Sequence, residues 1–141
     1  MLVQRFALIL GIVYLAAGVL GFFPGLMSPD TASGALTIEA FHGRLFGLFP
    51  VNILHNLVHL AVGIWGLAAM RDFNGSVSFS RGLAVIYGVL AVMGLIPVLN
   101  TLFGLVPLHS HDIWLHAGTA AVAAYFGWGA PARVRARMPV I

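Results

Sequence analysis

The sequence has little charge, no cysteine and no lysine. Only 8% of its 141 residues are charged, against roughly 25% in a typical soluble domain, and the mean hydropathy is +1.00. Such a composition excludes an ordinary soluble domain. The net charge of +3 is too small and too scattered for a nucleic-acid surface. Without cysteine, neither disulfides nor thiolate metal ligands are available. We therefore expect an integral membrane protein with the lipid bilayer as its main partner and no nucleic acid.

Four apolar segments approach the ~20 residues that a membrane-spanning helix needs. They are 6–23, 51–70, 82–98 and 111–128. The first follows a basic residue, as a signal peptide does, but its apolar run is longer than usual and no A-x-A cleavage site follows. We expect it to be retained. The sequence thus predicts a single all-α membrane domain over residues 1–141, built as a bundle of four transmembrane helices.

Arginine accounts for all seven basic residues, and its placement predicts the orientation of the chain. Only Arg44 lies in the loops on one side of the expected membrane. The loops and termini of the other side hold Arg5, Arg71, Arg81, Arg133, Arg135 and Arg137. Because cytoplasmic loops are enriched in basic residues, both termini are expected in the cytoplasm. The tail 129–141 is expected to contact anionic lipid headgroups or to act as a simple stop-transfer flank.

The sequence also contains an internal repeat. Residues 45–59 align with residues 102–116, with six identities in fifteen positions that include L-F-G-L-x-P and a histidine nine residues after the proline. Tyr14 aligns with Tyr87 when the preceding spans are superposed. We interpret the chain as two parallel helical hairpins, about 6–70 and about 82–128, so that the second and fourth helices are equivalent. Chance alignment of abundant Leu, Gly and Val is the alternative.

The loops carry weaker signals. In the long outer loop, residues 34–49 have the apolar spacing of a short amphipathic helix. The segment from Ser28 to Asp30 reads as a turn, and His42 as a histidine at the membrane interface. On the other side, residues 71–81 are polar and contain Asn74-Gly75, which predicts a turn in a cytoplasmic loop.

Polar residues follow one face of the second helix. Asn52, His55, Asn56 and His59 occur at i, i+3, i+4 and i+7 in an otherwise apolar segment. The fourth helix carries an i, i+4 pair, Asp112 and His116. Unpaired polar groups cost several kcal/mol in hydrocarbon, so these side chains are expected to meet one another or a ligand.

Two facing i, i+4 pairs would supply three imidazoles and one carboxylate. The sequence therefore predicts a metal site of His55, His59, Asp112 and His116, suited to zinc, copper, iron or nickel and poor for calcium or magnesium. Histidines on opposed helices, such as His59 and His116, are also the arrangement that clamps a haem b. The residues expected to support the site are Asn52, Asn56, His109, His111, Tyr14 and Tyr87.

Other readings of the same residues stay open. The polar cluster could be an interhelical hydrogen-bond network with no cofactor, in a non-catalytic accessory subunit of a larger membrane complex or in a homo-oligomer. Its histidines could also ligate a pigment at an interface of such a complex. A proton or ion path is weaker, because few polar groups continue inward from His59 and His116. Catalysis is less supported, because Asp112 is the cluster's only carboxylate and no nucleophile triad, phosphate loop or dinucleotide fingerprint is present. A bound metal or haem would serve storage, sensing, delivery or electron transfer.

Three segments carry a resemblance to a known family. GVLGFFPG (18–25), HNLVHLAVGIWGLAA (55–69) and LNTLFGLVPLHSHDIWLHAGTAAVAAYFG (99–127) resemble a bacterial membrane family catalogued as domain of unknown function 4383. The likeness runs from about Phe6 to Trp128, and the HNLVH and HDIWLH segments are its most specific parts. It implies a small four-helix, multi-pass protein of the bacterial cytoplasmic (inner) membrane, and it implies no activity.

Overall fold

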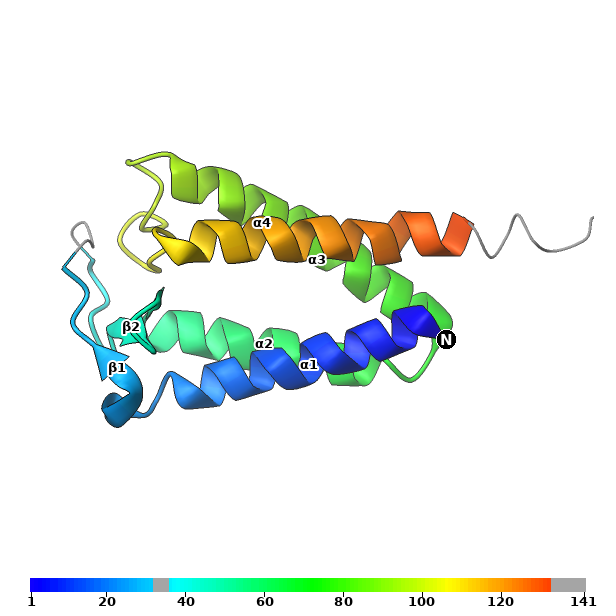
Figure 1. Ribbon diagram of the computed structural model, residues 1–141, viewed down its shortest axis with the longest axis horizontal. Coiled ribbons are helices and arrows are strands. Elements are labelled where there is room, and N and C mark those ends of the chain that lie inside the picture. The colour runs from blue at the N-terminus through cyan, green and yellow to red at the C-terminus, as the bar shows by residue number, and fades with distance from the viewer. Residues whose placement is uncertain (32–35, 133–141) are drawn as a thin grey trace, which may run out of the picture.

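The structure is a computed structural model that describes residues 1–31 and 36–132. Over these residues the chain is mostly helical, as expected, and forms two antiparallel helix pairs, α1 with α2 and α3 with α4 (Figure 1). The helices are α1 (Leu2–Leu20), α2 (Ile53–Ala69), α3 (Phe73–Leu95) and α4 (His111–Ala124). By length and composition, α1 and α3 are able to cross a membrane, whereas α2 is a shorter apolar helix.

The connection between α2 and α3 is much shorter than the sequence indicated. Helix α3 begins at Phe73 rather than Gly82, so most of the predicted 71–81 loop is helical and that boundary was wrong. Asp72 is the reason, because its side chain caps the helix and accepts a hydrogen bond from Gly75 N at 2.7 Å. Ser76 Oγ donates to Ala69 O at 2.9 Å and ties the new helix to the end of α2. The Asn74-Gly75 pair thus lies in a first helical turn.

The long loop after α1 forms a small sheet instead of the predicted amphipathic helix. After a 3-10 turn (Pro24–Leu26) come three short antiparallel strands in the order β1-β2-β3. They are β1 (Met27–Ser28), β2 (Gly43–Leu45) and β3 (Phe49–Val51). Phe46 and Gly47 both have positive φ, at 53° and 74°, which turns the chain sharply between β2 and β3. Helical spacing was therefore misleading here.

Glycine lets α1 and α2 approach each other closely. A Cβ placed on Gly63 would lie 2.7 Å from Leu15 N, and one on Gly66 would lie 2.8 Å from the Cα of Gly11. Small residues permit such backbone contact between helices. The buried apolar core lies between the two helix pairs and consists of Phe6, Ala7, Tyr14, Ala69, Phe79, Leu83, Tyr87 and Ala123.

At the other end of the molecule, α4 continues as a π-helical turn, Tyr125–Gly129. Arg81 Nε donates to the Gly127 carbonyl at 2.9 Å, and its guanidinium lies 5.6 Å from the Trp128 ring. Arginine therefore satisfies a carbonyl where the regular helical pattern ends. The predicted lipid-binding arginines of the tail, Arg133, Arg135 and Arg137, lie outside the described residues.

Candidate metal centre

The first turn of α2 is fixed by Asn52. Its side-chain oxygen accepts a hydrogen bond from His55 N at 3.0 Å, a normal N-cap, and its amide donates to the carbonyls of Ile38 at 2.9 Å and Leu105 at 2.7 Å. One fully buried amide therefore holds the loop between α1 and α2, the loop between α3 and α4 and the start of α2 together. Because His55 lies in the turn that Asn52 caps, its position is tied to both loops.

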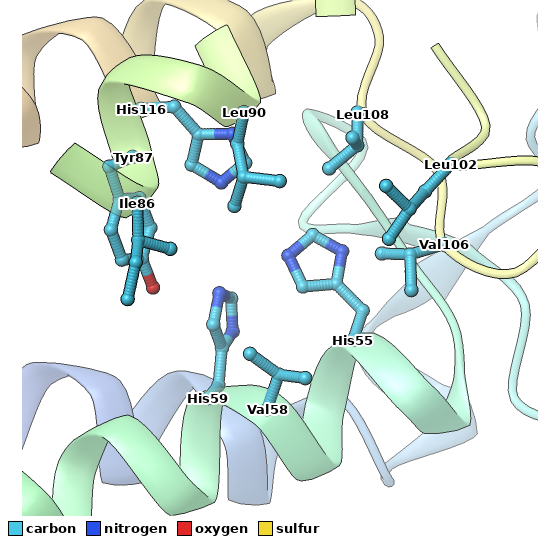
Figure 2. A pocket seen from close by; sticks show the side chains of 10 residues that line it. All are labelled: His55, Val58, His59, Ile86, Tyr87, Leu90, Leu102, Val106, Leu108 and His116. Atoms are coloured by element: carbon cyan, nitrogen blue, oxygen red, sulfur yellow. The ribbon is translucent and has the colours of Figure 1, made fainter. Parts of the chain in front are cut away.

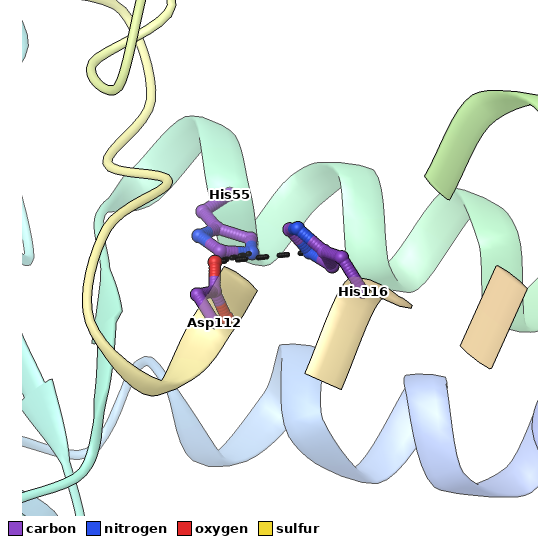
Figure 3. Close-up of side chains that lie close together, drawn as sticks. All are labelled: His55, Asp112 and His116. Carbon is purple, nitrogen blue, oxygen red and sulfur yellow. Dashed lines mark ion pairs between the residues drawn. The ribbon is translucent and has the colours of Figure 1, made fainter. Parts of the chain in front are cut away.

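Three ionisable side chains meet between α2 and α4, and we call them the His–Asp triad: His55, Asp112 and His116. Asp112 Oδ2 lies 3.7 Å from His55 Nε2 and 3.7 Å from His116 Nε2 (Figure 3). One ligating atom from each residue lies within 4.8 Å of the other two. All three residues are buried. The helical spacing thus brings an i, i+4 pair of α4 against the first turn of α2.

These separations are close to those of a metal site. Metal–ligand bonds of ~2.0–2.1 Å in a tetrahedral arrangement place neighbouring ligand atoms about 3.4 Å apart. Two edges of the triad measure 3.7 Å, so small side-chain movements would complete the geometry. Two imidazoles and one carboxylate form a donor set used for zinc and for non-haem iron, with coordination positions left open.

The triad also contains polar atoms that nothing satisfies. Within the described part of the chain, Asp112 Oδ2 and His116 Nδ1 are buried and have no hydrogen-bond partner. Buried polar atoms are nearly always hydrogen-bonded, so exceptions call for an explanation such as a bound ion or water. A cation between the ligand atoms would satisfy the carboxylate. It would leave His116 Nδ1 without the carbonyl or carboxylate acceptor that metal-bound histidines usually have.

His59, the fourth predicted ligand, lies beside the triad and outside the three-residue group. Its ring contacts that of His55, with centroids 4.4 Å apart. The rings of the two predicted tyrosines pack on those of the deeper histidines, Tyr14 on His59 with centroids 5.2 Å apart and Tyr87 on His116 with centroids 5.0 Å apart. The two tyrosine rings are themselves 5.4 Å apart. The role of His59 as a ligand stays a prediction.

A cavity of about 230 Å³ adjoins the triad (Figure 2). The rings of His55, His59 and His116 and the side chain of Tyr87 surround it on its inner side, and apolar side chains form the rest of the wall. Pockets for drug-sized ligands measure about 300–1,000 Å³. The space is therefore ample for an ion with its remaining ligands and too small for a haem.

The other predicted supporting residues have different partners. Asn56 Nδ2 donates to the Gly21 carbonyl at 2.8 Å, because one further step around α2 turns this side chain towards α1. His111 is exposed at the start of α4, and its Nδ1 lies 3.3 Å from Ser110 Oγ. His109 faces Asp30 rather than Asp112. None of these three side chains has a recorded contact with the triad.

Sequence reasoning missed a second polar group, the loop cluster of Asp30, His42, Arg44 and His109. Arg44 Nε donates to Asp30 Oδ1 at 2.9 Å, while His109 Nε2 and His42 Nε2 lie 3.2 and 3.5 Å from Asp30 Oδ2. The side chain of Asp30 is completely buried. In the sequence, Asp30 stands out only because acidic residues are rare, with four in the whole chain.

The surroundings of His109 in the loop cluster shift its pKa in opposite directions. Burial lowers the pKa of His109, the Asp30 carboxylate opposes that shift, and Arg44 and His42 add to the lowering. The neutral form of His109 is therefore favoured in the folded protein. A guanidinium beside the carboxylate makes this cluster a poorer cation site than the triad, which has no arginine among its recorded ion pairs.

Comparison with known proteins adds the family and nothing about activity. No curated protein and no solved structure gives a significant match to the chain. The family described as "Domain of unknown function (DUF4383)" matches residues 4–129, nearly the whole described chain, and includes every residue of the triad. On that match, the protein belongs to the DUF4383 family.

Proposed function

We propose that this chain is a multi-pass membrane protein that binds one transition-metal ion through His55, Asp112 and His116. The observation that carries the metal proposal is the buried carboxylate of Asp112, held 3.7 Å from each of two imidazole nitrogens. A buried carboxylate with one oxygen that accepts no hydrogen bond is costly, and a divalent cation would neutralise it. Zinc and ferrous iron suit the donor set best, and copper and nickel are also compatible with imidazole.

The membrane part of the proposal rests on the outer surface of the bundle. Large apolar side chains are exposed on all four helices, among them Ile12, Ile64, Val85 and Trp114. An apolar surface on every side of a helical pair is typical of contact with lipid. We propose that all four helices span the cytoplasmic membrane, that both termini lie inside, and that the sheet and the loop cluster lie at the outer end.

Duplication of a hairpin is supported by equivalent turns. The motif L-F-G-L-x-P occurs at 45–50 and 102–107, and its Phe and Gly have positive φ in both copies. The backbone bond from Leu48 N to Leu45 O at 3.1 Å has its counterpart from Leu105 N to Leu102 O at 3.2 Å. We infer that the two halves descend from one hairpin, with His55 replaced in the second by Asp112.

The packing of two histidines supports an alternative, purely structural function. His59 packs against Tyr14, and His116 against Tyr87, as part of the aromatic core. Such packing favours a structural role in which the imidazoles join the two hairpins, within an accessory subunit of a larger membrane complex. Haem b is disfavoured by the volume of the cavity.

Metal analysis of the purified protein distinguishes these proposals. The protein is purified in nanodiscs, its metals are counted by mass spectrometry, and its visible spectrum is recorded. We expect close to one metal ion per chain and no Soret band. His116→Ala should lower metal affinity by more than about 100-fold, since even residues that only orient ligands contribute 10–100-fold. His111→Ala, at an exposed histidine of the same helix, is the matched control and should retain the metal.

The opposite results are equally clear. A preparation that never takes up stoichiometric metal, with His116→Ala merely less stable than the wild type, would overturn metal binding and favour the structural role. A Soret band lost in His59→Ala and His116→Ala would establish haem instead.

A further inference from the structure

The cavity beside the triad opens on the outside of the bundle. Val58 on α2 and Ile86 on α3 belong to its wall, and each is 48% exposed. The histidines at its inner side are buried, with His116 only 2% exposed. The mouth therefore lies between α2 and α3, on the surface that would face hydrocarbon if these helices span a membrane. Leu102, Val106 and Leu108, from the loop between α3 and α4, also line the cavity, so molecules dissolved in the bilayer would reach it beside this loop.

The size of the cavity limits what it can hold. An engineered apolar cavity of about 150 Å³ is known to bind benzene. A volume of about 230 Å³ therefore accommodates one six-membered ring with a few substituent atoms. Larger fused ring systems and macrocycles are excluded. Around the mouth, Val58, Ile86 and Leu90 offer aliphatic contacts suited to the faces of such a ring.

The inner side of the cavity is formed by histidine rings whose nitrogens contribute almost no surface to it. His59 Nδ1 and His116 Nδ1 are buried and have no hydrogen-bond partner within the described residues. A neutral imidazole has one acceptor and one donor nitrogen, so it accepts a hydrogen bond from a hydroxyl group. With modest rotation, either ring could present a nitrogen to a guest. A compound with an apolar ring and one hydroxyl group would match both the wall and the inner side.

We propose that this cavity binds a lipid-soluble, single-ring phenol that enters between α2 and α3 and directs its hydroxyl group at the imidazoles of His59 and His116. The proposal goes beyond metal binding and does not depend on it, because it rests on the volume, the mouth and the imidazoles of the metal-free chain.

The test uses the full chain in nanodiscs, freed of metal by a chelator, and 4-(trifluoromethyl)phenol as the fluorine NMR probe. We expect a saturable bound signal, displaced by unlabelled 4-methylphenol. The polar contact is tested with 4-(trifluoromethyl)toluene, which has nearly the same shape and no hydroxyl group. It should bind at least 10-fold more weakly, and equal binding of the two probes would overturn the assigned hydrogen bond.

Matched variants then locate the binding. Ile86→Trp places an indole across the mouth and should abolish the saturable signal. Val85→Trp adds the same ring at the neighbouring position, which is 59% exposed and does not line this cavity. It should bind as the wild type does, and Val58→Trp should repeat the loss from the opposite helix. Signals without saturation, or unchanged in Ile86→Trp and Val58→Trp, mean lipid partition only and overturn the proposal.

Metal measurements separate this inference from the metal proposal. Ile86→Trp leaves the triad intact, so it should keep its metal while losing the phenol. Phenol binding by a chain that takes up no metal would leave the cavity proposal standing and remove the metal site. Metal uptake without phenol binding would do the reverse.

Discussion

The ring of Tyr14 lies 5.2 Å from that of His59, at an interplanar angle of 59°. Tyr87 and His116 repeat this contact in the other helix pair, at 5.0 Å and 69°. Because Tyr14 also contacts Tyr87, the two tyrosine–histidine pairs form one continuous aromatic layer across the molecule. The triad shares His116 with that layer, so the residues that join the two helix pairs also shape the proposed site.

Asp112→Asn should separate metal binding from folding. The variant keeps the shape of the side chain and removes a buried carboxylate that has one oxygen without a hydrogen-bond partner among the described residues. Without metal we expect unfolding at the same temperature as the wild type or a higher one, because a buried charge is no longer desolvated. Added zinc should raise the midpoint of the wild type and not that of the variant. Differential scanning fluorimetry in detergent measures both, and a zinc-induced rise in Asp112→Asn would contradict the role of this carboxylate.

Glycine packing between α1 and α2 gives a second prediction. Gly63→Ala places a methyl group 2.6 Å from Leu15 Cγ and 2.7 Å from its backbone nitrogen, so the helices must move apart. We expect a loss of roughly 1–3 kcal/mol in the free energy of unfolding. Gly118→Ala is the control, since its Cβ meets nothing within 4 Å. There the gain in helix propensity should stabilise by about 0.5–1 kcal/mol. Equal unfolding free energies for the two variants would show that the close approach does not exist.

The lowered pKa of His109 predicts that the stability of the fold depends on pH. Its pKa is lowered in the folded protein, chiefly by burial, so between that value and the unfolded pKa of about 6.5 the unfolded chain binds the extra proton. Stability from this residue is therefore complete above pH 6.5 and lost as the pH falls below it. One such group contributes at most about 1.4 kcal/mol per pH unit. Unfolding midpoints from pH 8 to pH 5 should fall less steeply in His109→Gln than in the wild type. Identical slopes would mean that His109 is protonated as easily in the fold as outside it.

The sequence predicted the helical character and the proximity of three of the four expected ligands for the same reason. Helical periodicity fixes which side chains share a face, and His55, Asp112 and His116 follow from it together with the internal alignment. Asn56 shows the limit of this reasoning. It belongs to the same polar stripe, yet its bond is to the Gly21 carbonyl on α1, because a stripe of that width faces two neighbouring helices.

Contacts between loops could not be predicted. Asp30 belongs to the loop between α1 and α2 and His109 to the loop between α3 and α4, and nothing in the local sequence around either residue indicates the other. The small sheet depends on the left-handed Phe46 and Gly47, whose effect on the chain outweighs the helical spacing of the surrounding apolar residues. The cavity was also missed, since Val58 and Ile86 look like ordinary lipid-facing residues in the sequence.

The ion pair between Asp30 and Arg44 should hold the sheet end of the molecule together. The side chain of Asp30 is completely buried and that of Arg44 mostly buried. Removing one partner of such a pair typically costs about 3–5 kcal/mol, because the other charge is left buried without compensation. Asp30→Asn should therefore release the loop between α1 and α2, with limited proteolysis cutting there before any helix unfolds. Glu39→Gln removes an exposed acid from the same loop and should leave the proteolysis rate unchanged. In Asp30→Asn with Arg44→Gln, both charges are absent and part of the protection should return, because no unpaired charge stays buried. If the double variant is cut as fast as Asp30→Asn, the shape of this carboxylate and its contacts with His42 and His109 are what close the loop, and the guanidinium contributes little.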